Sequence, residues 1–132
     1  MSNLDIVNVG TPTAGYTPEP APVLSSSTAS AVSSTAISGT VSTDKDSGTL
    51  YWYVSTSATP PTAGNLKAGT GSVSYGNQSV SATGTQEVLS MSGLTASTLY
   101  YVHYLHNDLA GASNLVVSSS VTTYGVPAGW QL

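Results

Sequence analysis

Short β-prone runs separated by turn residues fill the middle of the chain, with a turn about every 8–12 residues. The clearest run covers residues 49–55, where bulky side chains alternate with period 2: Leu50, Trp52 and Val54 against Tyr51 and Tyr53. Such alternation is typical of a strand with one face buried in a core. No stretch has a convincing helical period of 3.6.

The same criteria predict six main strands, at residues 23–31, 36–42, 49–55, 86–91, 99–106 and 115–123. The region between the third and fourth strands is less regular: residues 65–68 suit a short helical turn, 69–76 a loop or weak edge strand, and 79–82 a short strand. Turn residues gather at 44–48, 59–64 and 107–111. Together these elements predict an all-β sandwich of two sheets and about seven strands.

Residues 1–24 have a different composition and predict an extended arm before a sandwich at residues 25–123. The second half of the arm is proline-rich, which favours an extended backbone without internal hydrogen bonds. Its beginning carries a short apolar group that could add a strand to an exposed sheet edge: Leu4, Ile6, Val7 and Val9. A disordered linker is the usual interpretation of such a segment. The alternative, which we adopt as the expectation, is that a partner or a neighbouring copy holds the arm.

Residues 124–132 form a second predicted tail, which is apolar and contains Trp130 and Leu132. Leaving such side chains in water is unfavourable. Two interpretations stay open: Trp130 folds back on its own domain, or it anchors the chain in a partner, since buried tryptophans are common in interfaces.

Charge is scarce: only 6% of residues are charged, with two lysines, no arginine and a net charge of −4. Binding to nucleic acid requires a basic surface, and a polybasic membrane anchor requires a basic cluster. Two lysines supply neither, so we expect no binding to nucleic acid and no polybasic membrane anchor. No apolar run approaches the 18 residues typical of a membrane span. The first ten residues contain Asp5 and no basic segment, so we expect no signal peptide and synthesis in the cytoplasm.

The candidates for catalysis or metal binding are sparse. His103, His106 and Asp108 lie close in sequence, but two strand residues three positions apart point to opposite faces. Zinc requires three or four ligands, and the chain has two histidines and no cysteine. Asp44 and Asp46 fit a solvated turn better than a calcium site, which needs six or more oxygens. We assign no catalytic, cofactor-binding or metal-binding residue, and the hypothesis of a small hydrolase has no residue constellation behind it.

The outward side of the strands at 49–55 and 99–106 is predicted to carry Tyr51, Tyr53 and Tyr101 together. Ordinary cross-strand pairing that stabilises the sheet is the favoured interpretation. The alternative is a sugar-binding or adhesive surface, because tyrosine offers rigid amphipathic area.

The segment from Gly93 to Val102, Gly-Leu-Thr-Ala-Ser-Thr-Leu-Tyr-Tyr-Val, resembles the corner between the fifth and sixth strands of fibronectin type III domains. The resemblance implies that Leu94 packs below this corner and that the hydroxyl of Tyr100 bonds back to the nearby backbone. It also implies two faces for the sixth strand. Tyr100, Val102, Tyr104 and His106 would face inward, and Tyr101, His103 and Leu105 outward. Trp52 would join the core from the third strand.

Residues 38–123 more widely resemble a variant of this immunoglobulin-like or fibronectin type III-like domain that is common in structural proteins of tailed bacteriophages. Segments that carry the likeness include 48–52, 61–63, 67–69, 80–86, 101–111 and 118–123. The resemblance implies a non-enzymatic virion protein, for example a capsid decoration or accessory protein. Its partners would be capsid or tail subunits and copies of itself. The alternative is a host-recognition module of a fibre or spike that binds a glycan or receptor. Since such sandwiches host many functions, the likeness bears more on fold than on role.

Overall fold

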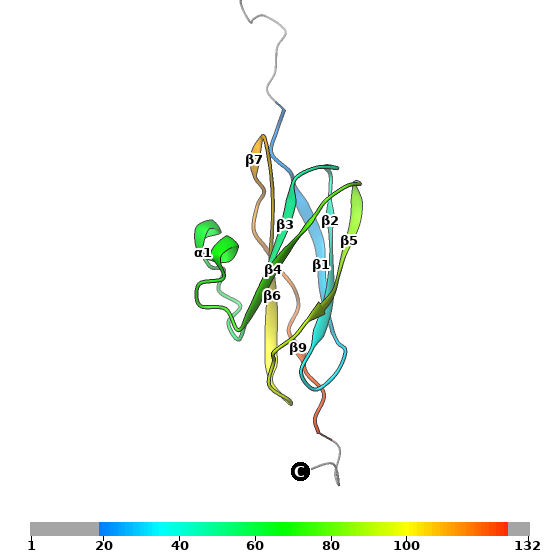
Figure 1. Cartoon of the computed structure of the whole chain (residues 1–132), viewed down its shortest axis with the longest axis vertical. Coiled ribbons are helices and arrows are strands. Elements are labelled where there is room, and N and C mark those ends of the chain that lie inside the picture. Colours follow the sequence, from blue (N-terminus) through cyan, green and yellow to red (C-terminus); the bar gives the residue numbers. More distant parts are fainter. Residues whose placement is uncertain (1–18, 127–132) are drawn as a thin grey trace, which may run out of the picture.

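The computed structural model describes residues 19–126 and contains two antiparallel sheets, which confirms the all-β, two-sheet prediction (Figure 1). One sheet has the order β1-β2-β5, and the other has β4-β3-β6 followed by three two-residue strands that pair with β6. The elements are β1 Leu24–Ala31, β2 Ile37–Thr43, β3 Thr49–Ser55, α1 Ala63–Ala68, β4 Ser74–Ser79, β5 Gly84–Met91, β6 Leu99–Asp108, β7 Gly111–Ala112, β8 Val116–Val117 and β9 Val121–Thr122.

The main core lies between the sheets. The inward side chains of β3 and β6 meet those of β2 and β5, among them Leu50, Val102, Val41 and Met91, all of which are fully buried. The alternation predicted for β3 is confirmed, because Leu50 and Val54 belong to this core while Tyr53 belongs to another cluster. Period-2 patterning therefore oriented the central strands correctly.

A second, smaller cluster lies on the outer face of the larger sheet. There Leu66 of α1 packs against Tyr53 and Leu105. The helix has a complete set of caps: Thr62 Oγ1 accepts from the N–H of Asn65 at 3.2 Å, and Gly69 ends the helix in the left-handed region at φ 76°. The helix thus places one buried side chain, Leu66, against the outer face of this sheet.

Two predicted strands differ in the structure. The prediction of a strand at 79–82 is wrong, because the edge strand β4 precedes it and ends at Ser79. The strand predicted at 115–123 is interrupted between β8 and β9. At the interruption, the buried Ser118 accepts a hydrogen bond from the N–H of Val102 with its side chain at 3.0 Å, where a regular ladder would use a carbonyl. A side chain has therefore replaced part of the ladder.

The described chain enters at one end of the elongated sandwich, beside β7, and leaves at the opposite end (Figure 1). The entering residues pack on the sandwich, since Pro22 and Leu24 are buried. Leu24 pairs with Thr43 of β2, and Asn114 holds its backbone as well: Asn114 Oδ1 accepts from Leu24 N at 2.9 Å, and Asn114 Nδ2 donates to Leu24 O at 3.1 Å. Within residues 19–126, no helix is long and apolar enough to cross a membrane.

Candidate functional site

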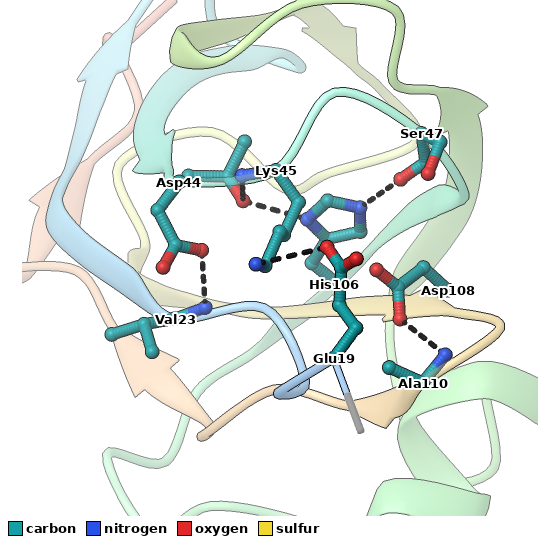
Figure 2. Close-up of polar contacts among 9 residues, drawn as sticks. Glu19, Val23, Asp44, Lys45, Ser47, His106, Asp108 and Ala110 are labelled. Carbon is teal, nitrogen blue, oxygen red and sulfur yellow. Dashed lines mark hydrogen bonds and ion pairs between the residues drawn. The ribbon is translucent and has the colours of Figure 1, made fainter. Parts of the chain in front are cut away.

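The end of the sandwich where the chain enters collects most of the described charge, and we call it the charged end. It contains Glu19, Asp44, Lys45, Asp46 and Asp108, whereas Glu87 lies in β5 and Lys67 lies in α1, from which its Nζ comes within 3.3 Å of Asn107 Oδ1. Three segments converge there: the entering chain, the β2–β3 turn and the β6–β7 turn (Figures 1 and 2). Four carboxylates against one ammonium group make this end acidic.

The charged groups at this end bind their own backbone and each other (Figure 2). Asp44 Oδ1 accepts from Val23 N–H at 2.8 Å, and Asp108 Oδ1 accepts from Ala110 N–H at 2.8 Å. Lys45 Nζ lies 3.1 Å from Glu19 Oε2, and this hydrogen bond and the other nearby carboxylates raise the pKa of Lys45. These contacts tie the entering chain to the β2–β3 turn. No group of three or more potential metal ligands occurs within residues 19–126.

His106 is fully buried beneath these turns and joins the two sheets (Figure 2). Its Nε2 lies 2.6 Å from the carbonyl oxygen of Ser47, and its Nδ1 lies 2.7 Å from Thr43 Oγ1. Because a carbonyl only accepts, Nε2 carries a proton and donates to Ser47 O. Both ring nitrogens are therefore occupied by structural bonds, which leaves none for general-base chemistry in this state.

His103 lies on the other face of β6, as predicted, but it is fully buried rather than exposed. Its Nε2 lies 3.0 Å from Ser57 O, and its ring packs edge-on against Tyr53 with centroids 5.8 Å apart. Its Nδ1 has no hydrogen-bond partner among residues 19–126. Burial lowers the pKa of His103 because the charged imidazolium is poorly solvated there. The two histidines are thus brought to opposite faces and form no joint site.

Folding stability is expected to fall with acidification partly through His103. The unfolded chain binds a proton at this ring near pH 6.5, whereas the folded chain binds it only at lower pH. The contribution that neutral His103 makes to the free energy of unfolding is therefore complete above about pH 6.5 and is lost as the pH falls below it. Urea unfolding at a series of pH values measures the free energy of unfolding. Between about pH 7 and pH 5, this free energy should fall less steeply for His103→Phe than for the wild type. Parallel wild-type and variant curves would contradict this.

The predicted outward group of Tyr51, Tyr53 and Tyr101 does not form an open aromatic surface. Tyr53 is buried beside Leu66, and its hydroxyl donates to the carbonyl of Thr70 at 2.8 Å. Tyr51 packs on the same cluster, and Tyr101 is only partly exposed at the far end of the strand pair. Coverage by α1 and the following loop explains the difference.

The residues predicted for the core and corner have the following positions. Leu94, Val102 and Tyr104 are buried, and Trp52 is partly buried against the same core. Tyr100 is buried, and its hydroxyl accepts from the N–H of Thr95 at 2.9 Å. The predicted partner-binding residues Leu4, Ile6, Val7, Val9, Trp130 and Leu132 lie outside the described residues.

The opposite end of the sandwich, which we call the apolar end, was not anticipated from the sequence. It presents Val32, Leu99, Tyr124 and Val126, which are 52%, 44%, 57% and 49% exposed. Three segments meet there, because Tyr124 N–H donates to Ser33 O and Tyr124 O accepts from Ser97 N–H, both at 3.2 Å. Val32, Leu99 and the pair Tyr124 and Val126 come from three separate segments, so no single run of the sequence predicts the group.

The two ends thus differ in chemistry, one acidic and internally bonded, the other uncharged and apolar. Neither end contains a group of three or more potential metal ligands within residues 19–126. No protein-family model matches the chain, and a comparison with curated proteins finds no relative.

Proposed function

We propose that this protein is a non-enzymatic structural component of a tailed-bacteriophage virion, a decoration or accessory protein held on the capsid or tail by its terminal segments. The observation that carries the proposal is the placement of the chain ends. The described chain enters and leaves at opposite ends of the long axis (Figure 1). Segments that continue from these ends reach two separate neighbours, and two weak contacts on one assembly bind more tightly than either alone.

The finer fold assignment belongs to the same proposal. A fibronectin type III-like or immunoglobulin-like sandwich is supported by the strand order β1-β2-β5 against β4-β3-β6. The buried Tyr100 with its bond to Thr95 further supports it. Structural use of the polar groups also favours a non-enzymatic role, because His106 and His103 each bond a backbone carbonyl of the chain itself.

The arm is testable through particle occupancy. Host cells would supply either the full chain or a chain lacking residues 1–10 during particle assembly, and mass spectrometry of purified particles would count the copies bound. We expect the deletion to lower occupancy at least about tenfold, since one of two linked contacts is lost. Ile6→Asp should act in the same direction, because a carboxylate is unfavourable in an apolar contact.

Leu109→Asp serves as the matched control, since Leu109 is fully exposed on the turn between β6 and β7. It adds the same charge outside residues 1–24 and should leave occupancy unchanged. Equal occupancy of the full and shortened chains would refute anchoring by the arm.

Host recognition is the second candidate, and Tyr75 is the observation that favours it. Its ring is 54% exposed and lies directly against the α-carbon of Gly69, where a side chain would collide with it. Such a fixed aromatic face suits stacking on a sugar ring. Normal occupancy with lost adsorption to host cells in a Tyr75→Ala variant would favour this function over anchoring alone.

A further inference from the structure

The connection between β3 and β4, residues 56–73, lies on the outer face of the larger sheet and includes α1 (Figure 1). We call it the strap. Two side chains of the sheet bind its backbone. His103 Nε2 donates to Ser57 O at 3.0 Å, since a carbonyl only accepts. The Tyr53 hydroxyl donates to Thr70 O at 2.8 Å. His103 and Tyr53, whose rings pack edge-on, therefore fasten the strap near both of its ends.

The main core lies elsewhere, so the strap can leave the sheet without opening that core. Leu66 is the one buried residue of the strap, and it packs with Tyr53 and Leu105 in the small outer cluster. The main core lies between the two sheets and includes none of these three residues. Segments with few buried apolar contacts open at a lower free energy than the whole fold. The strap has the properties of such a locally opening segment.

A proton on the second ring nitrogen of His103 is unfavourable while the strap is in place. The ring is fully buried, and its Nδ1 has no hydrogen-bond partner among residues 19–126. Protonation of Nδ1 therefore creates a buried donor without an acceptor, together with a buried charge. The same burial lowers the pKa of His103.

The groups around His103 offer no compensating negative charge. Its neighbours are β3, the strap and β8, whose sequences contain no carboxylate, and β4 beside them contains none either. Tyr53 faces the ring from β3, and Tyr101 lies two positions away on the same face of β6. Lys67 is the one charged residue of the strap, and it has the same sign as a protonated imidazole. The charged ring therefore gains most by reaching water.

We propose that protonation of His103 releases the strap from the sheet while the two sheets stay folded. Release frees the ring from beneath Ser57 and brings it into water. It also uncovers Tyr53 and Leu105, so that the protein presents a different, more apolar face at acidic pH. This inference does not depend on the virion role.

Native-state hydrogen exchange of the full chain at pH 7.5 and pH 5.5, corrected for the intrinsic exchange rates, tests the proposal. The N–H groups of Leu66 and Thr70 report on the strap, because both are hydrogen-bonded within it. The exposed ring binds its proton near pH 6.5, whereas the buried ring binds it only at lower pH. The opening constant should therefore rise about tenfold from pH 7.5 to pH 5.5.

Low concentrations of urea separate release of the strap from unfolding of the whole chain. Release exposes little surface, so exchange at Leu66 and Thr70 should respond weakly to urea. The N–H groups of Val80 and Leu94, which bond to Gly48 O and Thr35 O outside the strap, should exchange faster as urea is added.

Two variants test the role of the ring. His103→Gln does not titrate, and its amide can still donate to Ser57 O, so it should lose the pH response. Ser55→Asp places a carboxylate beside the ring, because Ser55 Oγ lies 3.4 Å from His103 Nε2. The carboxylate stabilises the protonated ring in place, so the change at Leu66 and Thr70 should shrink to less than about threefold. Urea unfolding establishes that each variant is folded, and if His103→Gln fails to fold, Ser55→Asp decides.

Three results would overturn the inference. Equal protection of Leu66 and Thr70 in the wild type at the two pH values would mean that protonation does not release the strap. A tenfold change that persists in the folded variants would assign the response to another group. Exchange at Leu66 and Thr70 that follows urea as steeply as exchange at Val80 and Leu94 would mean that the strap opens only when the whole chain unfolds.

Discussion

Replacing Gly39 with valine is expected to lower the free energy of unfolding by about 3–5 kcal/mol. Gly39 lies in the middle of β2 beneath the ring of Tyr104, whose hydroxyl donates to the carbonyl of Thr28 at 3.0 Å. A β-carbon at residue 39 would overlap that hydroxyl and would lie only 2.6 Å from the Thr28 oxygen. Overpacking costs about 1–3 kcal/mol, and loss of a buried hydrogen bond that leaves its partners unsatisfied adds about 1–3 kcal/mol. Urea unfolding monitored by tyrosine and tryptophan fluorescence measures the change.

The matched control is Gly64→Ala in α1. A β-carbon on Gly64 would meet no atom within 4 Å, so this variant gains helix propensity without a clash. It should be neutral or more stable by up to about 1 kcal/mol.

A double-mutant cycle isolates the hydroxyl of Tyr104. Burial raises the pKa of this hydroxyl well above its usual range, so it stays a proton donor in the folded chain. Gly39→Ala should cost less in a Tyr104→Phe background than in the wild type, by about 1 kcal/mol. Additive costs would show that Gly39 is required for a reason other than the Tyr104 hydroxyl.

The second large effect is expected for His106→Ala, with a loss of about 2–4 kcal/mol. The substitution leaves a cavity between the sheets and removes the partner of Ser47 O at 2.6 Å and of Thr43 Oγ1 at 2.7 Å. Cavity formation and the unpaired polar groups act in the same direction. Urea unfolding gives the total, and hydrogen exchange should show faster exchange in the β2–β3 turn, which the ring holds in place.

Asp108→Asn is the control for this variant. It lies two residues away at the same end, and an asparagine Oδ1 can still accept from the N–H of Ala110. Its effect should stay within about 0.5 kcal/mol. If His106→Ala were as mild as Asp108→Asn, His106 would not be a structural link between the sheets.

Much of the fold follows from local pattern. Bulky residues that alternate from Leu50 to Val54 specify both a strand and its buried face, and residues 49–55 were predicted with the bounds that the structure has. The turn at residues 44–48 also follows locally, since Gly48 adopts φ 93°, which glycine favours. Period 2 separates His103 from His106 without knowledge of their surroundings, because strand geometry alone sends residues three apart to opposite faces.

Other features depend on contacts between distant residues. Tyr53 and His103 were predicted to face outward, and both are buried, because α1 and its flanking loops cover that face of the sheet. The position of α1 in turn depends on the packing of Leu66, a tertiary contact. The break between β8 and β9 depends on Ser118 meeting Val102, sixteen residues away. The glycine at position 39 reads as a weak point in a strand. The structure explains why glycine is needed there: the hydroxyl of Tyr104 passes close to Gly39 and donates to the carbonyl of Thr28.

By itself, the sequence determined the all-β class and the orientation of the central strands, because composition and period 2 act locally. Only the tertiary structure decided that carboxylates gather at one end and apolar side chains at the other. Val32, Leu99 and Tyr124 are far apart in the chain, and loop closure rather than sequence proximity makes them neighbours. These surface groupings were therefore set by topology, which no local pattern records.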